Sequence, residues 1–294
     1  MALVRTPERA GSLSAIGCEV VAGDLRSREA IRKGVDGCDA CFHVAGDYRI
    51  GVSEAECREM EASNVGGTER VIDAATDAGV GRIVYVSTIG VFGDTRGEVV
   101  DETYWRAAER FQSCYERTKY LAHAAARDRI EKGAPVIIVQ PGGVYGPGDP
   151  SPLANLIEQT RKGRMKLVPI GETGFNFVHV DDVVQGILLA HDKGEIGQSY
   201  VLGGQMARTE DLVRTVAMLS GRRPPLGHIP GFLVKAAVPM GRMLGPAFGL
   251  GPNMREAVAA ARSTYWASDE KARRELGYSP RDLETGLAQT LAAS

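Results

Sequence analysis

Arg82-Ile-Val-Tyr-Val-Ser-Thr88 is apolar at almost every position before it ends in two adjacent hydroxyl side chains. Such a run predicts a strand that is buried on both faces of a parallel sheet. Outward from it, similar short runs occupy residues 2–5, 18–22, 40–44 and 135–140. Longer helical patterns lie between the runs, at residues 7–16, 27–35, 54–78 and 112–132. This alternation predicts an α/β fold, doubly wound and Rossmann-like, with a mostly parallel sheet.

The second half of the chain loses this strict alternation. Helices are expected at residues 152–162, 181–191, 209–219 and 256–261, joined by short strand-like pieces. We therefore expect a domain over residues 1–150 and a smaller α+β lobe over 151–294, with residues 176–192 returning to the first domain. The stretch 221–252 is rich in Gly, Pro, Met and Leu. It is either a segment that covers substrate or contacts a second subunit, or a loosely packed helix and loop.

Composition excludes several classes of protein. The 294 residues carry a net charge of −2, so no overall positive field exists to attract nucleic acid or an anionic membrane. We find no signal peptide and no apolar run of the ~18 residues that a membrane span needs. The five cysteines are an odd number in a chain of this length, which argues against a disulfide framework and favours a reducing cytoplasm. His43 and His179 lack metal-ligand partners at suitable spacing, so we interpret both as core histidines and expect no metal.

Tyr115 and Lys119 are the first candidates for catalysis. Their i,i+4 spacing on a predicted helix places both side chains on one face, so the ammonium group can lower the pKa of the phenol. The alternative is an ordinary exposed helix face. Thr88 follows a parallel strand at its carboxyl end, where ligands bind in open α/β sheets. Its hydroxyl either polarises a substrate carbonyl or caps the following turn.

Seven motifs in a fixed order resemble the extended short-chain dehydrogenase/reductases, the NAD-dependent epimerase/dehydratase family. They are Gly23-Asp-Leu25, Phe42-His-Val-Ala-Gly46, Asn64-Val-Gly-Gly-Thr68, Val86-Ser-Thr88, Tyr115 with Lys119, Gln140-Pro-Gly-Gly-Val-Tyr-Gly-Pro-Gly-Asp149 and Phe177-Val-His-Val-Asp-Asp-Val183. The resemblance runs from Ala2 nearly to the C-terminus. It implies a dinucleotide-binding first domain and a substrate-binding second lobe.

The resemblance also implies catalytic roles. Thr88 aligns with the family's catalytic Ser or Thr, and Tyr115 with its general acid/base. Lys119 aligns with the residue that binds the nicotinamide ribose and tunes the tyrosine, so Tyr115 and Lys119 both border the cofactor. Pro141 and Val144 would lie beside the nicotinamide ring.

The same resemblance implies a nucleotide-binding set. Asp24 would accept a hydrogen bond from the adenine amino group while Leu25 packs on the ring. Val44, Ala45 and Gly46 would lie along the ribose and phosphates, with Gly46 allowing close backbone approach.

Asn64 and Arg5 complete the cofactor assignments. Asn64 would tether neighbouring backbone, although packing inside a helix is an alternative. Arg5 ends the strand where the family usually carries an acidic residue for the ribose of NAD, and an arginine suits a 2′-phosphate instead. The expected cofactor is therefore NADP, with NAD as the alternative.

One departure from the family pattern is large. The family begins with a strand, a glycine-rich loop and a helix that hold the cofactor pyrophosphate, but this sequence begins at what resembles the second strand. The first strand and the glycine-rich loop are therefore expected to be missing, which would leave unpaired strand edges. Three explanations remain open: a fragment of a longer protein, a partner or rearranged strand that fills the gap, or a homologue that no longer binds dinucleotide.

The stretch His43-Val-Ala-Gly-Asp-Tyr-Arg49 resembles the dihydroflavonol-reductase-like branch. The implied activity is NAD(P)-dependent reduction of a carbonyl, or oxidation of a hydroxyl, on a small and moderately apolar substrate. Two alternatives are an epimerase or dehydratase acting on a sugar derivative, and a non-catalytic sensor or scaffold with the same fold. The expected partner is the small-molecule substrate, and the resemblance implies a possible homodimer through the long helices.

Overall fold

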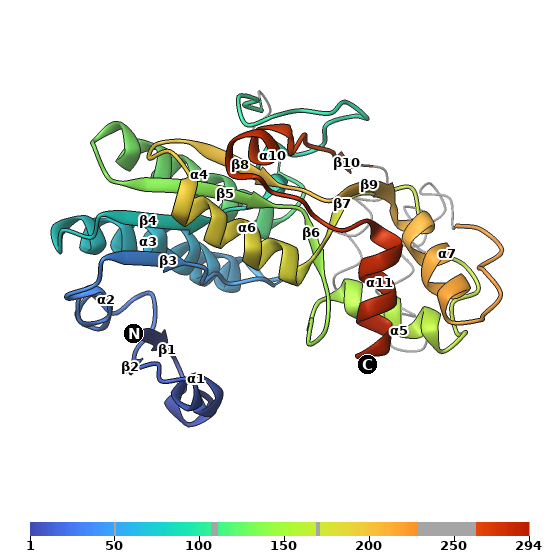
Figure 1. The fold of residues 1–294 in the computed structure, drawn as a ribbon, viewed down its shortest axis with the longest axis horizontal. Helices are drawn as coiled ribbons and strands as arrows, with labels where there is room; N and C mark the ends of the chain where they lie inside the picture. Colours follow the sequence, from blue (N-terminus) through green and yellow to red (C-terminus); the bar gives the residue numbers. More distant parts are fainter. Residues whose placement is uncertain (50, 107–110, 169–170, 229–262, 294) are drawn as a thin grey trace.

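The structure is a computed structural model that describes residues 1–49, 51–106, 111–168, 171–228 and 263–293. The helix expected at 256–261 and most of the stretch 221–252 lie outside the described residues. Figure 1 shows a layer of strands with helices on both faces, and a smaller lobe, containing α5, α7 and α11, at the end of the molecule away from the N-terminus.

The main sheet consists of four parallel strands in the order β3-β4-β5-β8. Their bounds are β3 (Ala40–His43), β4 (Arg82–Val86), β5 (Val136–Pro141) and β8 (Ser199–Leu202). All six residues of β5 are buried, as expected of a strand that is covered on both faces. The predicted doubly wound α/β fold is therefore confirmed.

Helices cover both faces of this sheet. One face packs against α3 (Glu54–Asp77) and α4 (Cys114–Glu131), and the other against α6 (Val180–Lys193) and α10 (Glu270–Leu276). Alternate residues of β4 pack on opposite faces of the sheet: Ile83 and Tyr85 face α3 and α4, while Val84 faces α6. The helix α3 begins with a capping box, in which Ser53 and Glu56 satisfy each other's backbone N–H groups.

The N-terminal residues form a separate parallel pair, β1 (Ala2–Val4) and β2 (Val20–Ala22). The pair is accompanied by η1 (Pro7–Arg9), α1 (Gly11–Ala15) and α2 (Arg28–Val35). Among the described residues, β1 pairs with β2 alone and β3 with β4 alone, so no ladder joins the N-terminal pair to the main sheet. The absence of a strand and a glycine-rich loop between them stays a prediction.

The smaller lobe is built around a second sheet. Its strands are β6 (Gly143–Tyr145), β7 (Gly174–His179), β9 (Gln205–Arg208) and β10 (Thr264–Tyr265), and its helices are α5 (Pro152–Arg161), α7 (Thr209–Leu219) and α11 (Leu283–Ala292). Of the segment expected to return to the first domain, α6 does lie on the main sheet, whereas β7 belongs to this second sheet.

A disulfide joins Cys57 of α3 to Cys114, the first residue of α4. Sequence reasoning argued against a disulfide framework and did not anticipate this single bond, while Cys18, Cys38 and Cys41 are free. The two cysteines are 57 residues apart in sequence, and only the packing of α3 against α4 brings them together. Within the described part of the chain, no helix combines the length and apolarity needed to cross a membrane.

Candidate active site

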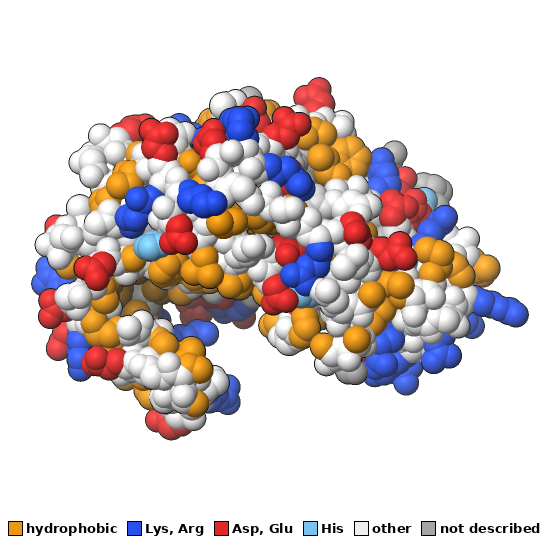
Figure 2. Space-filling view, viewed as in Figure 1, with side chains coloured by type: hydrophobic (Ala, Val, Ile, Leu, Met, Phe, Trp, Pro, Cys, Tyr) orange, Lys and Arg blue, Asp and Glu red, His pale blue; other side chains and the backbone are white. Residues whose placement is uncertain are grey.

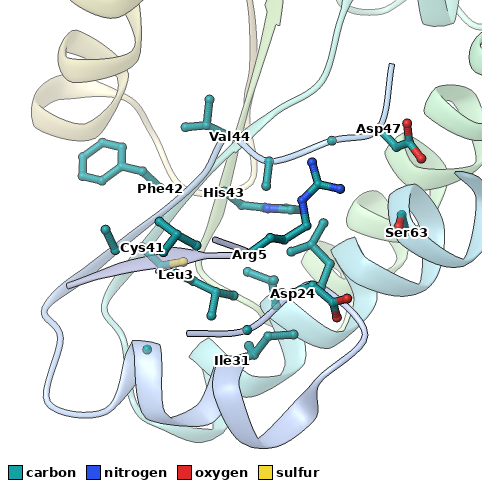
Figure 3. A pocket seen from close by; sticks show the side chains of 18 of the residues that line it. Leu3, Arg5, Asp24, Ile31, Cys41, Phe42, His43, Val44, Asp47 and Ser63 are labelled. Atoms are coloured by element: carbon teal, nitrogen blue, oxygen red, sulfur yellow. The ribbon is translucent and has the colours of Figure 1, made fainter. Parts of the chain in front are cut away.

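A cleft of about 1430 Å³ separates the N-terminal pair from the main sheet. It is lined by six of the residues predicted to bind cofactor, namely Arg5, Asp24, Leu25, Val44, Ala45 and Gly46. Figure 3 shows Arg5 and Asp24 reaching into it from the ends of neighbouring strands, with Val44 and Asp47 on the segment that follows β3. The surface is hollowed between the N-terminal residues and the smaller lobe (Figure 2). The structure thus brings together residues that are up to 41 positions apart, from Arg5 to Gly46.

The polar residues of this cleft have defined partners. Asp24 accepts hydrogen bonds from the backbone N–H of Arg26 at 2.8 Å and from its guanidinium Nη2 at 2.9 Å. The same guanidinium lowers the pKa of Asp24. Arg5 is exposed where it lines the cleft. The sequence did not indicate that Arg26 would hold the carboxylate expected to contact adenine.

Leu25 owes its position to a glycine. A Cβ on Gly67 of α3 would come within 2.9 Å of the Leu25 side chain, so only glycine admits this contact. Arg70, also on α3, donates to the carbonyl of Leu25 at 2.7 Å. The apolar side chain is thereby held at the edge of the cleft, as a residue that packs on a flat ring requires.

Asn64 fixes the segment that follows β3. Its amide oxygen accepts the N–H of Asp47 at 2.7 Å, and its amide nitrogen donates to the Asp47 carbonyl at 2.9 Å. The same nitrogen donates to the Thr118 hydroxyl at 3.0 Å, and that hydroxyl donates to the carbonyl of Tyr115 at 3.0 Å. The predicted tether is therefore confirmed, and it also connects the cleft to the helix of Tyr115.

The first turn of α4 carries Tyr115 and is held from several sides. The hydroxyl of Ser113 accepts the backbone N–H of Glu116 at 3.0 Å, which caps the helix. The buried carboxylate of Glu116 pairs with Arg106, and Cys114 is bonded to Cys57. The backbone that carries the Tyr115 phenol is therefore held in place.

Lys119 lies one turn further along α4 and is buried. Its ammonium group donates to the carbonyl of Val86 at 3.0 Å and lies 5.4 Å from the centre of the Tyr85 ring. Burial lowers the pKa of Lys119 to about 8. Burial also raises the pKa of Tyr115, and the neighbouring Tyr48 and Tyr85 add to that rise. The expectation that Lys119 lowers the Tyr115 pKa is thus wrong in this structure, because desolvation dominates.

Thr88 lies two residues beyond the carbonyl that receives Lys119. Its hydroxyl accepts the N–H of Gly90 at 3.1 Å and caps η2 (Ile89–Phe92), which packs against α4. A hydroxyl that accepts in this way still has its own proton to donate. The cap and the catalytic interpretation are therefore compatible.

Pro141 and Val144 lie at and just beyond the end of β5, the next strand of the sheet. Pro141 is the last residue of β5, next to β4, and Val144 lies in β6 against the cluster of the main sheet. Neither lines the cleft, and the same holds for Asn64, Thr88, Tyr115 and Lys119. Six of the predicted residues thus lie in the cleft. The others lie near the ends of β4 and β5, in β6, in the first half of α4 and, for Asn64, in the middle of α3.

The histidines of the motifs are structural. His43 is 3% exposed, contacts the Thr68 hydroxyl at 3.0 Å and stacks on Tyr85, and burial lowers its pKa to about 3. His179 is buried and accepts the N–H of Asp181 at 3.2 Å, which caps α6. The core-histidine interpretation is confirmed for both. Among the described residues, no cluster of His, Cys, Asp and Glu is arranged to hold a metal ion.

Sequence reasoning missed Tyr48, which connects the cleft to Tyr115. Tyr48 lines the cleft, and its ring lies 4.6 Å from that of Tyr115. The signal was present in Asp47-Tyr48-Arg49, which contributed to the resemblance without a role being assigned to the aromatic residue.

The residues of the cleft fit a dinucleotide. A volume of about 1430 Å³ exceeds the ~300–1000 Å³ typical of small-molecule pockets, so an extended ligand can be accommodated. Arg5 supplies a guanidinium for a phosphate, Asp24 a carboxylate for an amino group, and Leu25 an apolar contact for a ring. Gly46 keeps the backbone accessible along the wall, since a Cβ there would meet only the Asn64 amide at 3.6 Å.

Comparison with known proteins identifies the family of this chain. The model of the NAD dependent epimerase/dehydratase family matches residues 2–203, and the chain belongs to this family. A 4-hydroxy-2-methyl-3-oxo-4-farnesyl-3,4-dihydroquinoline-1-oxide ketoreductase of Stigmatella aurantiaca is 33% identical over 95% of this chain and 84% of its own length. A putative dihydroflavonol 4-reductase of Synechocystis sp. is 30% identical over 99% of this chain and 85% of its own.

A solved structure shows the same fold. The crystal structure of gox2253 superposes with a TM-score of 0.83 at 34% identity, covering 99% of this chain and 88% of that one. With the site described above, these similarities define the class: the chain is an NAD(P)-dependent oxidoreductase of the extended short-chain dehydrogenase/reductase type.

Proposed function

We propose that this protein is an NADP-dependent carbonyl reductase that acts on a ketone or aldehyde of a small, moderately apolar molecule. The observation that carries the proposal is that one residue, Tyr48, links the cleft to the predicted proton donor Tyr115. Tyr48 lines the cleft that suits a dinucleotide and also contacts Tyr115, so a cofactor and a proton donor can meet at one substrate.

Arg5 supports NADP over NAD. Its exposed guanidinium lies in the cleft at the end of β1, where it can bind a 2′-phosphate through charge-assisted hydrogen bonds. Asp24, Leu25, Val44, Ala45 and Gly46 would hold the rest of the nucleotide. When bound, the cofactor supplies the hydride that reduces the carbonyl carbon.

The chain's own residues manage the proton. Because burial raises the pKa of Tyr115, the phenol keeps its proton at neutral pH and can give it to the developing alkoxide. The Thr88 hydroxyl would donate a hydrogen bond to the same substrate oxygen. Lys119 has a pKa of about 8, so most molecules carry its positive charge at neutral pH, which stabilises negative charge near the phenol.

The residue after Thr88 disfavours an elimination reaction. Ile89 is 2% exposed and packs with Val91 and Phe92, so an apolar side chain follows the catalytic hydroxyl. Removal of a proton next to the substrate carbonyl requires a base, and Ile89 cannot provide one. This supports simple carbonyl reduction over dehydration of a sugar.

The test uses the purified chain with NADPH or NADH and a panel of ketones and aldehydes, some aromatic and some aliphatic. We expect consumption of reduced nicotinamide with at least one carbonyl, faster with NADPH than with NADH. Tyr115→Phe should lose turnover by about 10²-fold or more while it binds NADPH with unchanged affinity. The proposal fails if no carbonyl in the panel is reduced, or if Tyr115→Phe is as active as the wild type.

A further inference from the structure

Tyr48 makes a ring contact with Tyr115. The two rings meet nearly at a right angle, with an interplanar angle of 85°. This edge-to-face arrangement is one of the favoured geometries of aromatic pairs. The phenol assigned to proton transfer is therefore packed against a second aromatic ring on a different segment of the chain.

The backbone beside Tyr48 is fixed. Its neighbour Asp47 exchanges two hydrogen bonds with the Asn64 amide, and the carboxylate of Asp47 pairs with Arg49 at 2.6 Å. Asn64 is 3% exposed, so its amide group is shielded from water. Because Asn64 also bonds Thr118 of α4, the separation between the Tyr48 segment and the Tyr115 helix is set by hydrogen bonds as well as by ring packing.

Part of the Tyr48 ring remains accessible. The residue is 49% exposed although it contacts Tyr115 and lines the cleft. An aromatic surface of this kind, held by a fixed backbone beside a proton donor, is suited to contact the group attached to a reacting carbonyl.

We propose that Tyr48 is a positioning residue for Tyr115 and a specificity-determining residue for the substrate, selecting carbonyl compounds with an aromatic group next to the carbonyl. The selective role rests on the proposed carbonyl reduction. The positioning role rests on the ring contact and the Asn64 hydrogen bonds alone.

The first experiment compares two substrates that differ at one group. Ethyl benzoylacetate carries a phenyl ring on its ketone carbon, and ethyl acetoacetate carries a methyl group there. We expect Tyr48→Ala to lower kcat/KM for the phenyl ester about tenfold more than for the methyl ester, which corresponds to ~1.4 kcal/mol, the size of an aromatic contact. Tyr48→Phe retains the ring and should keep the wild-type ratio. An unchanged ratio in Tyr48→Ala would overturn the selective role.

The second experiment does not depend on activity. Tetranitromethane nitrates accessible tyrosines, and mass spectrometry locates the modified residues. Tyr115 should be nitrated several-fold faster in Tyr48→Ala than in the wild type or Tyr48→Phe, with circular dichroism confirming that all three proteins are folded. Equal rates in the three proteins would overturn the positioning role. If the wild type reduces neither ester nor any other carbonyl, the proposed function and the selective role fall, while nitration still decides the positioning role.

Discussion

Removal of the Cys57–Cys114 disulfide should lower the free energy of unfolding. The size of the loss depends on the length of the loop that the bond closes. The bond closes a loop of 57 residues. In the chain-entropy model, a cross-link over a loop of this length reduces the entropy of the unfolded chain enough to stabilise the native state by about 4 kcal/mol. That is a large part of the ~5–15 kcal/mol typical of a folded domain.

Urea unfolding followed by circular dichroism measures this difference. The free energy of unfolding of the wild type should fall by about 4 kcal/mol when a dithiol reductant is added. The double variant Cys57→Ser/Cys114→Ser serves as the control, because it should match the reduced wild type and show no response to reductant. Cys18, Cys38 and Cys41 are present in both proteins and cancel in the comparison.

Two results would refute this reasoning. One is a wild type whose unfolding free energy is the same with and without reductant. The other is a thiol titration of the unreduced, unfolded wild type that finds all five cysteines free.

Three further predictions concern the site. Arg5→Ser should weaken NADPH binding about tenfold, because it removes a charge-assisted hydrogen bond to an exposed group, and should leave NADH binding unchanged. Fluorescence titration measures both affinities, with Arg9→Ser as the control, and equal losses for both nucleotides would contradict the prediction. Asn64→Ala removes three hydrogen bonds, one buried and two partly buried, and should cost about 3 kcal/mol of unfolding free energy. A loss below about 1 kcal/mol would show that the tether is not required. Because Lys119 releases its proton near pH 8 when folded and at about 10.5 when unfolded, the unfolded chain binds more protons between these values, so raising the pH favours the folded state. Relative to Lys119→Met, the wild type should gain up to about 3 kcal/mol from pH 8 to 10.5, and parallel stability curves for the two proteins would exclude the low pKa.

Much of the fold could be predicted from local patterns. The apolar run at 82–87 became β4, and the helix expected at 54–78 became α3 with nearly the same bounds. The single helix expected at 7–16 is instead a 3-10 turn followed by the short α1. Pro7 begins the turn, and Ala10 separates it from α1 with a φ of −92° and a ψ of 17°, outside helical geometry.

The site was harder to predict where it depends on burial or on contacts between distant segments. The i,i+4 spacing correctly placed Tyr115 and Lys119 on one helix, but spacing carries no information about desolvation, which sets the direction of both pKa shifts. The Cys57–Cys114 bond and the Tyr48–Tyr115 contact both depend on how α4 packs against earlier parts of the chain. No local pattern contains that information.

The N-terminal pair of strands has a thermodynamic consequence. β1 and β2 share no ladder with β3, and the cleft lies between them. A nucleotide in that cleft would touch Arg5 and Asp24 on one wall and Val44 on the other. Detachment of the N-terminal pair would then also abolish the binding site, so the two equilibria are coupled. We therefore expect saturating ligand to slow amide hydrogen exchange in residues 2–22 more than in the interior strand β5.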